Sequence, residues 1–280
     1  MALVKPFRAL RYDVEAAGPL DRLVAPPYDV ITPGARERLL AASDYNVVRL
    51  IRPHEPDEAG RAFRDWRAGG ILVRDDRPAA WLLEETFVGP DAVERTRRGI
   101  VARLRLHPYS DGVVLPHERT FAGPKEARLR LLHAVRTKLS PIFLLHDGAP
   151  PPAAPERPPD LEAALAGATS RLWRLDDPAQ ASAALDRVQP PLLIADGHHR
   201  YETALRFHEE EGSGETAYVL AALVSRDDPG LVVWATHRLV RGSVPDLDGR
   251  FRITVKPTRT TSYRLATRAG AGGAITVKPR

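Results

Sequence analysis

The amino-acid sequence predicts a mixed α/β or α+β fold, because segments with helical periodicity alternate with short apolar runs typical of strands. Its 280 residues suffice for one large or two ordinary domains, each with a buried core. The longest unbroken apolar run, residues 217–224, is far shorter than the roughly 20 residues that a membrane-spanning helix needs. The first 14 residues carry three basic side chains and no apolar stretch typical of a signal peptide. We therefore expect a cytoplasmic protein without a membrane partner.

The first half of the chain contains clear signals for helices and strands. Thr32 followed by a proline is typical of an N-cap and a first helical residue, and residues 46–51 are expected to form a strand. Apolar residues recur at i, i+3, i+4 and i+7 in residues 59–66, which predicts a helix that the next glycine pair ends. Apolar and arginine residues alternate over 102–106, as in a strand with one solvated face. Further strands are expected at 71–73, 80–86 and 142–145, and a basic helix at 125–138.

Six of the eleven residues from 149 to 159 are proline, which fits neither a helix interior nor a paired strand. This segment is predicted to be a linker or surface loop between an N-terminal α/β region, residues 1–148, and a second region, residues 160–249. The second region is expected to contain a short helix from Asp160 and a helix capped by Asp177. The remaining expected elements are strands at 172–175, 192–195, 218–225 and 231–236, the last two as a hairpin, and a helix at 201–211.

Charge and cysteine content exclude several functions. The formal net charge is +5, but residues 250–280 carry eight basic and no acidic residues, so the other 249 residues carry 33 basic and 36 acidic ones, a net charge of −3. The body of the protein therefore lacks the basic character expected of a protein that binds nucleic acid. The basic tail, 250–280, is expected to be poorly packed, as a disordered or truncated segment. The chain has no cysteine, which excludes disulfides, thiolate nucleophiles and cysteine-rich zinc sites.

The segment IADGHHRY, residues 194–201, is the strongest candidate for a functional site. A buried strand leads to Asp196, Gly197 allows a tight turn, and Arg200 lies in the first turn of the following helix. Free amides at a helix start, its dipole and a guanidinium together favour a bound phosphate. His198 and His199 could donate hydrogen bonds or move a proton, and Asp196 could orient a histidine or hold Mg²⁺. The alternative is that Asp196 is only an N-cap and both histidines lie on the surface.

A second polar group occurs in LPHERTFAGPKEARLR, residues 115–130. Glu118 is a candidate general base and Lys125 a candidate phosphate contact. Because Phe121 occupies the position of the second histidine of HExxH, the segment does not predict a zinc protease. Solvated charges around a loop and a helix start are the alternative interpretation.

A third candidate is VAPPYDVITP, residues 24–33, where two prolines stiffen a loop that could direct Tyr28 and Asp29 at a ligand. A proline-rich entry to the Thr32-capped helix is the alternative. The candidate substrate-binding residues of the chain are Tyr28, Asp29, His117 and Glu126. The common nucleotide and hydrolase motifs GxxxxGK[ST], GxGxxG and GxSxG are absent.

The motifs PFRALRYD, APPYDVI, HERTxxxxKExR and IADGHHRYETA, in this order, resemble the domain-of-unknown-function 1015 family from Ala2 to about Val240. That family is grouped with ParB and sulfiredoxin-like proteins and is distantly similar to free serine kinases. The resemblance implies a ParB/sulfiredoxin-like core around a strand-turn-helix phosphate site, with an additional N-terminal sheet and helices. It implies a nucleotide site formed by Gly197, His198, His199 and Arg200, with Lys125 and Arg128 as a second phosphate clamp. Catalytic roles are implied for Glu118, Asp196, His198 and His199, whereas sulfiredoxin chemistry is excluded because it needs a cysteine.

We therefore expect an enzyme of small-molecule phosphoryl transfer, a kinase-like transferase in serine metabolism that acts on free serine or phosphoserine. ATP or ADP is the expected cofactor, with Mg²⁺ held by Asp196. A non-catalytic nucleotide-binding regulator of the ParB type, associated with DNA, is the alternative. Nucleotide binding without formation of a phosphorylated product would favour the non-catalytic regulator.

Overall fold

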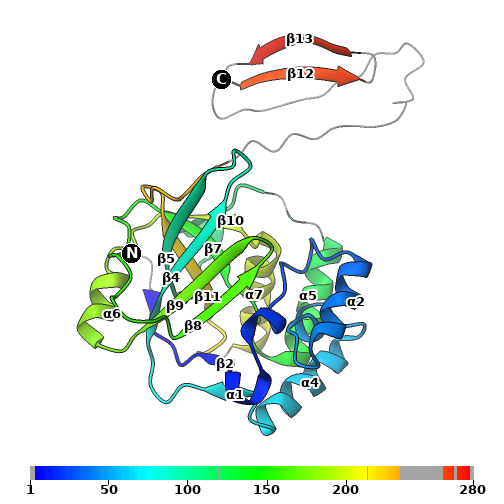
Figure 1. Ribbon diagram of the computed structural model, residues 1–280, viewed down its shortest axis with the longest axis vertical. Helices are drawn as coiled ribbons and strands as arrows, with labels where there is room; N and C mark the ends of the chain where they lie inside the picture. The colour runs from blue at the N-terminus through cyan, green and yellow to red at the C-terminus, as the bar shows by residue number, and fades with distance from the viewer. Residues whose placement is uncertain are drawn as a thin grey trace. The chain divides into compact units, whose positions relative to one another are not determined.

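Helices and strands are mixed along the chain, which confirms the α+β class (Figure 1). The computed structural model describes residues 4–118, 120, 122–212 and 214–233, and the backbone of 261–267 and 270–277. The chain divides into two compact units, Met1–Val232 and Val233–Arg280. The helices are α1 Val14–Ala17, α2 Pro33–Ala42, α3 Val48–Ile51, α4 Pro56–Ala68, α5 Ala122–Val135, α6 Pro178–Leu185 and α7 His198–Glu211.

A nine-stranded sheet forms the centre of the first unit. Its order is β6-β10-β7-β11-β5-β4-β9-β8, and β1 also pairs with β5. The β6–β10 and β7–β11 pairs are parallel and the other pairs are antiparallel. The strands of this sheet are β1 Val4–Lys5, β4 Ala80–Val88, β5 Glu94–Arg105, β6 Val114–Leu115, β7 Ile142–His146, β8 Leu161–Leu165, β9 Ala168–Leu175, β10 Leu192–Asp196 and β11 Tyr218–Ser225. Strands β2 Leu10–Tyr12 and β3 Leu72–Arg74 form a separate antiparallel pair.

Two main apolar clusters hold the unit together. The larger one joins the sheet to α6 and α7, and a second one lies among α4, α5 and β3. Helix α5 packs against both α4 and α7 (Figure 1). Tyr201 anchors α7, because its fully buried hydroxyl accepts from the amide of His107 at 3.0 Å and donates to the carbonyl of the same residue at 2.9 Å. The start of α7 is thereby held against the loop that follows β5.

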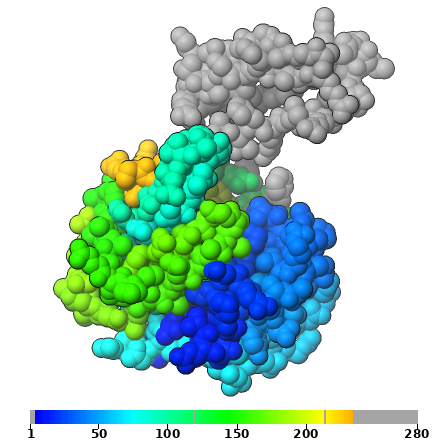
Figure 2. Space-filling model, viewed as in Figure 1, coloured from blue at the N-terminus to red at the C-terminus, as the bar shows by residue number. Residues whose placement is uncertain are grey.

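Several expected elements are confirmed. Thr32 caps α2 by accepting from the amide of Ala35, and Asp177 caps α6 by accepting from the amide of Ala179. Helix α4 ends at Gly69 and α7 at Gly212, as expected. The proline-rich segment contains neither helix nor strand, and β9 after it pairs with β4 before it. Residues on both sides of the segment therefore belong to one sheet, and Figure 2 shows 160–175 against the N-terminal residues on one face.

Three expected elements are wrong. Residues 48–51 form a helical turn, not a strand, because the buried Asn46 side chain accepts from the amide of Val48 and donates to two carbonyls of an earlier segment. Residues 161–165 form a strand, not a helix, since they pair with β9 across a turn with positive φ at Ala166 and Gly167. Strand pairing here overrides the helical propensity of the sequence LEAAL.

The expected hairpin of 218–225 with 231–236 is the third wrong prediction. Strand β11 lies between β5 and β7 in the sheet, so both of its edges are paired. Residues 231–233 form no strand, and 234–236 lie outside the described residues.

In the second unit, β12 Thr261–Thr267 pairs antiparallel with β13 Gly270–Val277. The described backbone of the basic tail thus forms a strand pair, and its poor packing stays a prediction, since residues 250–260, 268–269 and 278–280 lie outside the described residues. Across the described residues, no helix combines the length and apolar character needed to cross a membrane.

Candidate functional site

The turn between β10 and α7 has the strand-glycine-helix geometry that the sequence predicts. Gly197 has a φ of 100°, which L-residues rarely adopt, and it occupies the N-cap position without a side-chain hydrogen bond to the helix start. A Cβ atom at Gly197 would lie 3.1 Å from Ile142 Cδ1 and 3.1 Å from Arg200 Nη2. The backbone angle favours glycine, and both neighbouring side chains would have to move by a few tenths of an ångström to admit a Cβ atom. The interpretation of Asp196 as an N-cap is therefore wrong.

Arg200 folds back over this turn. Its guanidinium forms an ion pair with Asp196, one helical turn away, and donates to the backbone carbonyl of Pro141. The two opposite charges partly neutralise each other beside Gly197. Asp196 thus holds Arg200, whereas the sequence favoured a histidine or a metal ion as its partner.

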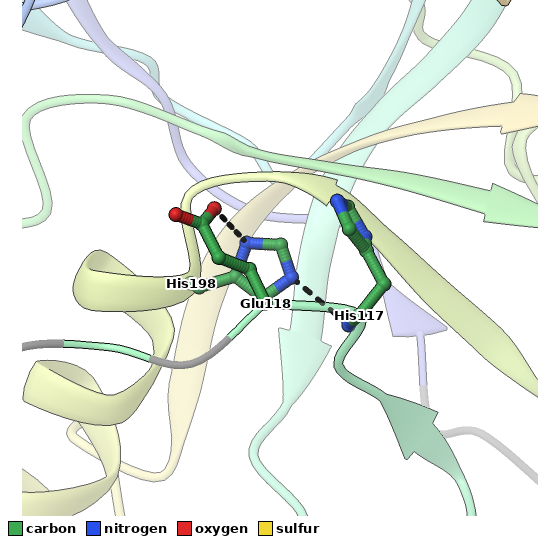
Figure 3. A group of neighbouring side chains, drawn as sticks. All are labelled: His117, Glu118 and His198. Carbon is green, nitrogen blue, oxygen red and sulfur yellow. Dashed lines mark hydrogen bonds and ion pairs between the residues drawn. The ribbon is translucent and has the colours of Figure 1, made fainter. Parts of the chain in front are cut away.

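Three side chains meet on another side of the turn (Figure 3). His117 and Glu118 come from the loop after β6, and His198 is the first residue of α7. The His198 ring is buried, and its Nε2 accepts from the backbone amide of His117 at 3.2 Å. Its Nδ1 lies 3.6 Å from a Glu118 carboxylate oxygen, and the two imidazole rings form an edge contact with centroids 4.5 Å apart. The structure therefore brings together predicted residues that lie about 80 positions apart in the sequence.

Hydrogen bonds define where the protons of these groups lie. Because Nε2 of His198 accepts, the proton of the neutral ring is on Nδ1, which faces the Glu118 carboxylate. His117 Nδ1 lies 2.6 Å from the carbonyl oxygen of Ile194, which only accepts, so Nδ1 is the nitrogen that carries the proton in the neutral ring. Burial, together with the neighbouring His117, lowers the pKa of His198 below its usual value. A neutral His198 beside an exposed carboxylate is suited to hold and pass a proton.

The same three residues are the group in the described part of the chain that could hold a metal ion, with ligand atoms within 4.8 Å of one another. The geometry does not favour His198 as a ligand, because Nδ1 carries the proton when Nε2 accepts from His117. Mg²⁺ also prefers oxygen ligands, of which this group offers only Glu118. The cluster therefore fits proton transfer better than metal binding.

Glu202 is a site residue that the sequence interpretation missed. Its carboxylate accepts from Lys125 Nζ at 2.9 Å and from the Thr120 hydroxyl at 2.6 Å. Burial raises the pKa of Glu202, but these hydrogen bonds outweigh burial and the pKa is lowered overall. The sequence does contain a signal for Glu202, because it lies four residues after His198 and so shares its helix face. Lys125, the predicted phosphate contact, is thus ion-paired and held close to the turn.

Tyr28 and Arg128, predicted separately, are in contact. The Arg128 guanidinium lies 4.1 Å from the centroid of the Tyr28 ring and donates to the carbonyl of Ile51 at 2.7 Å. Burial lowers the pKa of Arg128, and the nearby cation Arg200 lowers it further. Asp29 is exposed and lies close enough to influence the same guanidinium. The Tyr28 loop, α5 and the start of α7 therefore form one polar region.

Glu126 and His199 are less central than the sequence predicts. Glu126 pairs with Arg206, which lies more than one helical turn beyond Arg200 on α7. His199 is half-buried, and its charged form lowers the pKa of Glu202. Of the predicted residues, Glu126 is therefore the one whose described contact points away from the turn.

Comparisons with known proteins give one match. A family model described as "Protein of unknown function (DUF1015)" matches residues 4–278. This match covers the basic tail and so extends beyond the boundary near Val240 that the motifs predicted. No curated protein and no solved structure matches the chain, so a ParB/sulfiredoxin-like fold stays a prediction.

Proposed function

Because the chain belongs to the DUF1015 family, whose description assigns no activity, we propose a function from the site itself. The proposed function is phosphoryl transfer from ATP or ADP to a small hydroxylated metabolite, with free serine as the expected acceptor. The observation that carries the proposal is the Glu118 carboxylate 3.6 Å from Nδ1 of a buried His198, at the uncapped start of α7. A phosphate-binding element and a proton acceptor are thus adjacent.

The turn is suited to bind phosphates. A helix start without a side-chain cap leaves amides that can donate to phosphate oxygens, and the helix dipole adds positive potential. Lys125 and Arg128 lie three residues apart on α5, on the same face of the helix. In this proposal both cations contact phosphate oxygens while Glu202 and Tyr28 hold them in place.

The reaction needs few covalent roles from the protein. The acceptor hydroxyl oxygen forms a bond to the terminal phosphorus, the bond from that phosphorus to the leaving phosphate breaks, and Glu118 accepts the hydroxyl proton. His198 Nδ1 stabilises the Glu118 carboxylate before the transfer. A Mg²⁺ ion bound with the nucleotide would neutralise phosphate charge, and Asp196 is the carboxylate of the turn that could hold it.

The test is a phosphorus NMR assay of purified protein with serine, Mg²⁺ and either ATP or ADP. Glu118→Gln removes the proton acceptor while keeping the side-chain shape, and we expect a rate loss of roughly 10²- to 10⁴-fold. Its melting temperature should not change, because 55% of the Glu118 side chain is exposed. Glu209→Gln, at an exposed position of α7, is the matched control and should retain the wild-type rate.

Two results would contradict the proposal. A Glu118→Gln protein with the wild-type rate would remove Glu118 as the proton acceptor. Nucleotide binding without any phosphorylated product, across a panel of hydroxylated amino acids and sugars, would favour the non-catalytic regulator.

A further inference from the structure

A pocket lies beside the Gly197 turn and contains about 70 Å³ of free space. This is several times the roughly 10–15 Å³ that one water needs, so a molecule of a few non-hydrogen atoms fits. Aliphatic side chains form much of its wall. Its lining includes the cations Arg128, Lys138 and Arg200 and the aliphatic residues Leu132, Leu139 and Ile142.

Lys138 is the unexplained group in this wall. Its Nζ atom is buried and has no hydrogen-bond partner among the described residues. The ammonium lies 4.9 Å from the centroid of the Phe207 ring, which attracts the cation but offers no lone pair to accept its hydrogen bonds. Burial lowers the pKa of Lys138 to about 8. A buried amine without an acceptor is costly, which indicates that an anionic group from outside the chain completes the site.

The charges around the pocket also favour an anion. Three cationic side chains line it, and none of its described lining residues is acidic. Arg128 is occupied by the Tyr28 ring and a backbone carbonyl, and Arg200 by Asp196. Lys138 is therefore the lining cation whose charged nitrogen makes no hydrogen bond within the described residues.

We propose that this pocket binds a small organic carboxylate with a branched or short aliphatic body. Its carboxylate accepts from Lys138 Nζ, which a rotation of the long lysine side chain moves from the Phe207 ring toward the pocket. Its aliphatic part packs against Leu132, Leu139 and Ile142. The aliphatic wall favours such a ligand over inorganic phosphate, which has no apolar surface to bury.

This site does not depend on phosphoryl transfer, although it shares Tyr28, Arg128 and Arg200 with the proposed phosphate site. Its test uses the full chain without nucleotide and measures binding by calorimetry and by thermal shift. The probes are 3-methylbutanoate, its neutral amide 3-methylbutanamide, and inorganic phosphate. We expect 3-methylbutanoate to bind and raise the melting temperature, and the amide and phosphate to bind at least tenfold more weakly.

Lys138→Met keeps the length of the side chain and removes its charge. Because the wild-type amine is buried without a partner, the variant should melt at the same or a higher temperature in the absence of ligand. Its affinity for 3-methylbutanoate should fall by about 30-fold or more, the loss typical of removing one partner of a buried charge pair. Lys138→Arg should retain part of the affinity, and Lys5→Met is the matched control away from the pocket.

A second measurement needs no variant. Reductive methylation of wild-type protein, mapped by mass spectrometry, should modify Lys138 more slowly when 3-methylbutanoate is present and at an unchanged rate with the amide. The proposal is overturned if Lys138→Met binds 3-methylbutanoate as tightly as wild type, or if the carboxylate gives no shift and no protection. Equal or tighter binding of phosphate would replace the carboxylate by a phosphate ligand.

Discussion

The glycine at the turn gives the sharpest test of the site geometry. Gly197→Ala places a methyl group on a residue with φ of 100°, outside the left-handed region that L-residues usually occupy. Holding an L-residue at this positive φ costs about 1–2 kcal/mol of folding free energy. The new Cβ would also lie 3.1 Å from the methyl of Ile142, which is fully buried in a central strand, and 3.1 Å from the Arg200 guanidinium. Crowding a packed site adds about 1–2 kcal/mol. We therefore expect Gly197→Ala to lower the free energy of unfolding by about 2–4 kcal/mol.

Gly212→Ala, at the other end of the same helix, is the matched control. Gly212 has a φ of 64°, and no atom lies within 4 Å of the position of its Cβ. Only the cost of a positive φ applies at Gly212. The free energy of unfolding should therefore fall by about 1 kcal/mol. Urea unfolding followed by circular dichroism and tryptophan fluorescence gives both values. The reasoning is refuted if Gly197→Ala is no more destabilising than Gly212→Ala.

Two further predictions concern buried polar groups. Asn46→Ala removes three hydrogen bonds that a fully buried side chain makes to the backbone, and should lower the free energy of unfolding by about 3 kcal/mol in urea titrations; a loss below about 1 kcal/mol would contradict this. Burial lowers the pKa of His198 and of His146, so the unfolded chain binds more protons than the folded protein once the pH falls below about 6.5. Stability should therefore fall from that pH down to the lowered folded pKa, with a slope of at most about 1.4 kcal/mol per pH unit for each histidine. Unfolding curves at several pH values should show that the stability of His198→Asn changes less steeply with pH than that of wild type. An unchanged pH dependence would argue against a buried neutral ring.

Local signals in the sequence predicted the elements that depend on near neighbours. The caps at Thr32 and Asp177, the helix stops at Gly69 and Gly212, and the turn at Gly197 all involve contacts within about four residues. Such contacts depend on backbone angles and side-chain types that the sequence states directly. The same holds for the chemistry that the absence of cysteine excludes.

Tertiary structure decided the features that need a distant partner. Residues 161–165 became a strand because β9 pairs with them, and the turn after Asn46 formed because its side chain reaches carbonyls more than 20 residues earlier. Burial and long-range pairing outweigh the small propensity differences that distinguish helix from strand in short apolar runs.

The candidate site also combines features that the local sequence predicts with contacts that only the fold creates. The sequence by itself determined that a polar segment, IADGHHRY, follows a buried strand and begins a helix, and that His117, Glu118, Lys125 and Arg128 offer suitable side chains. Only the fold decided that His198 faces Glu118, that Asp196 holds Arg200 and that Glu202 holds Lys125. It also buried the amine of Lys138 without an acceptor, which no local pattern indicates. The reason is physical: hydrogen bonds and burial depend on distances in space, and distances between residues far apart in the chain exist only once the sheet and helices have packed.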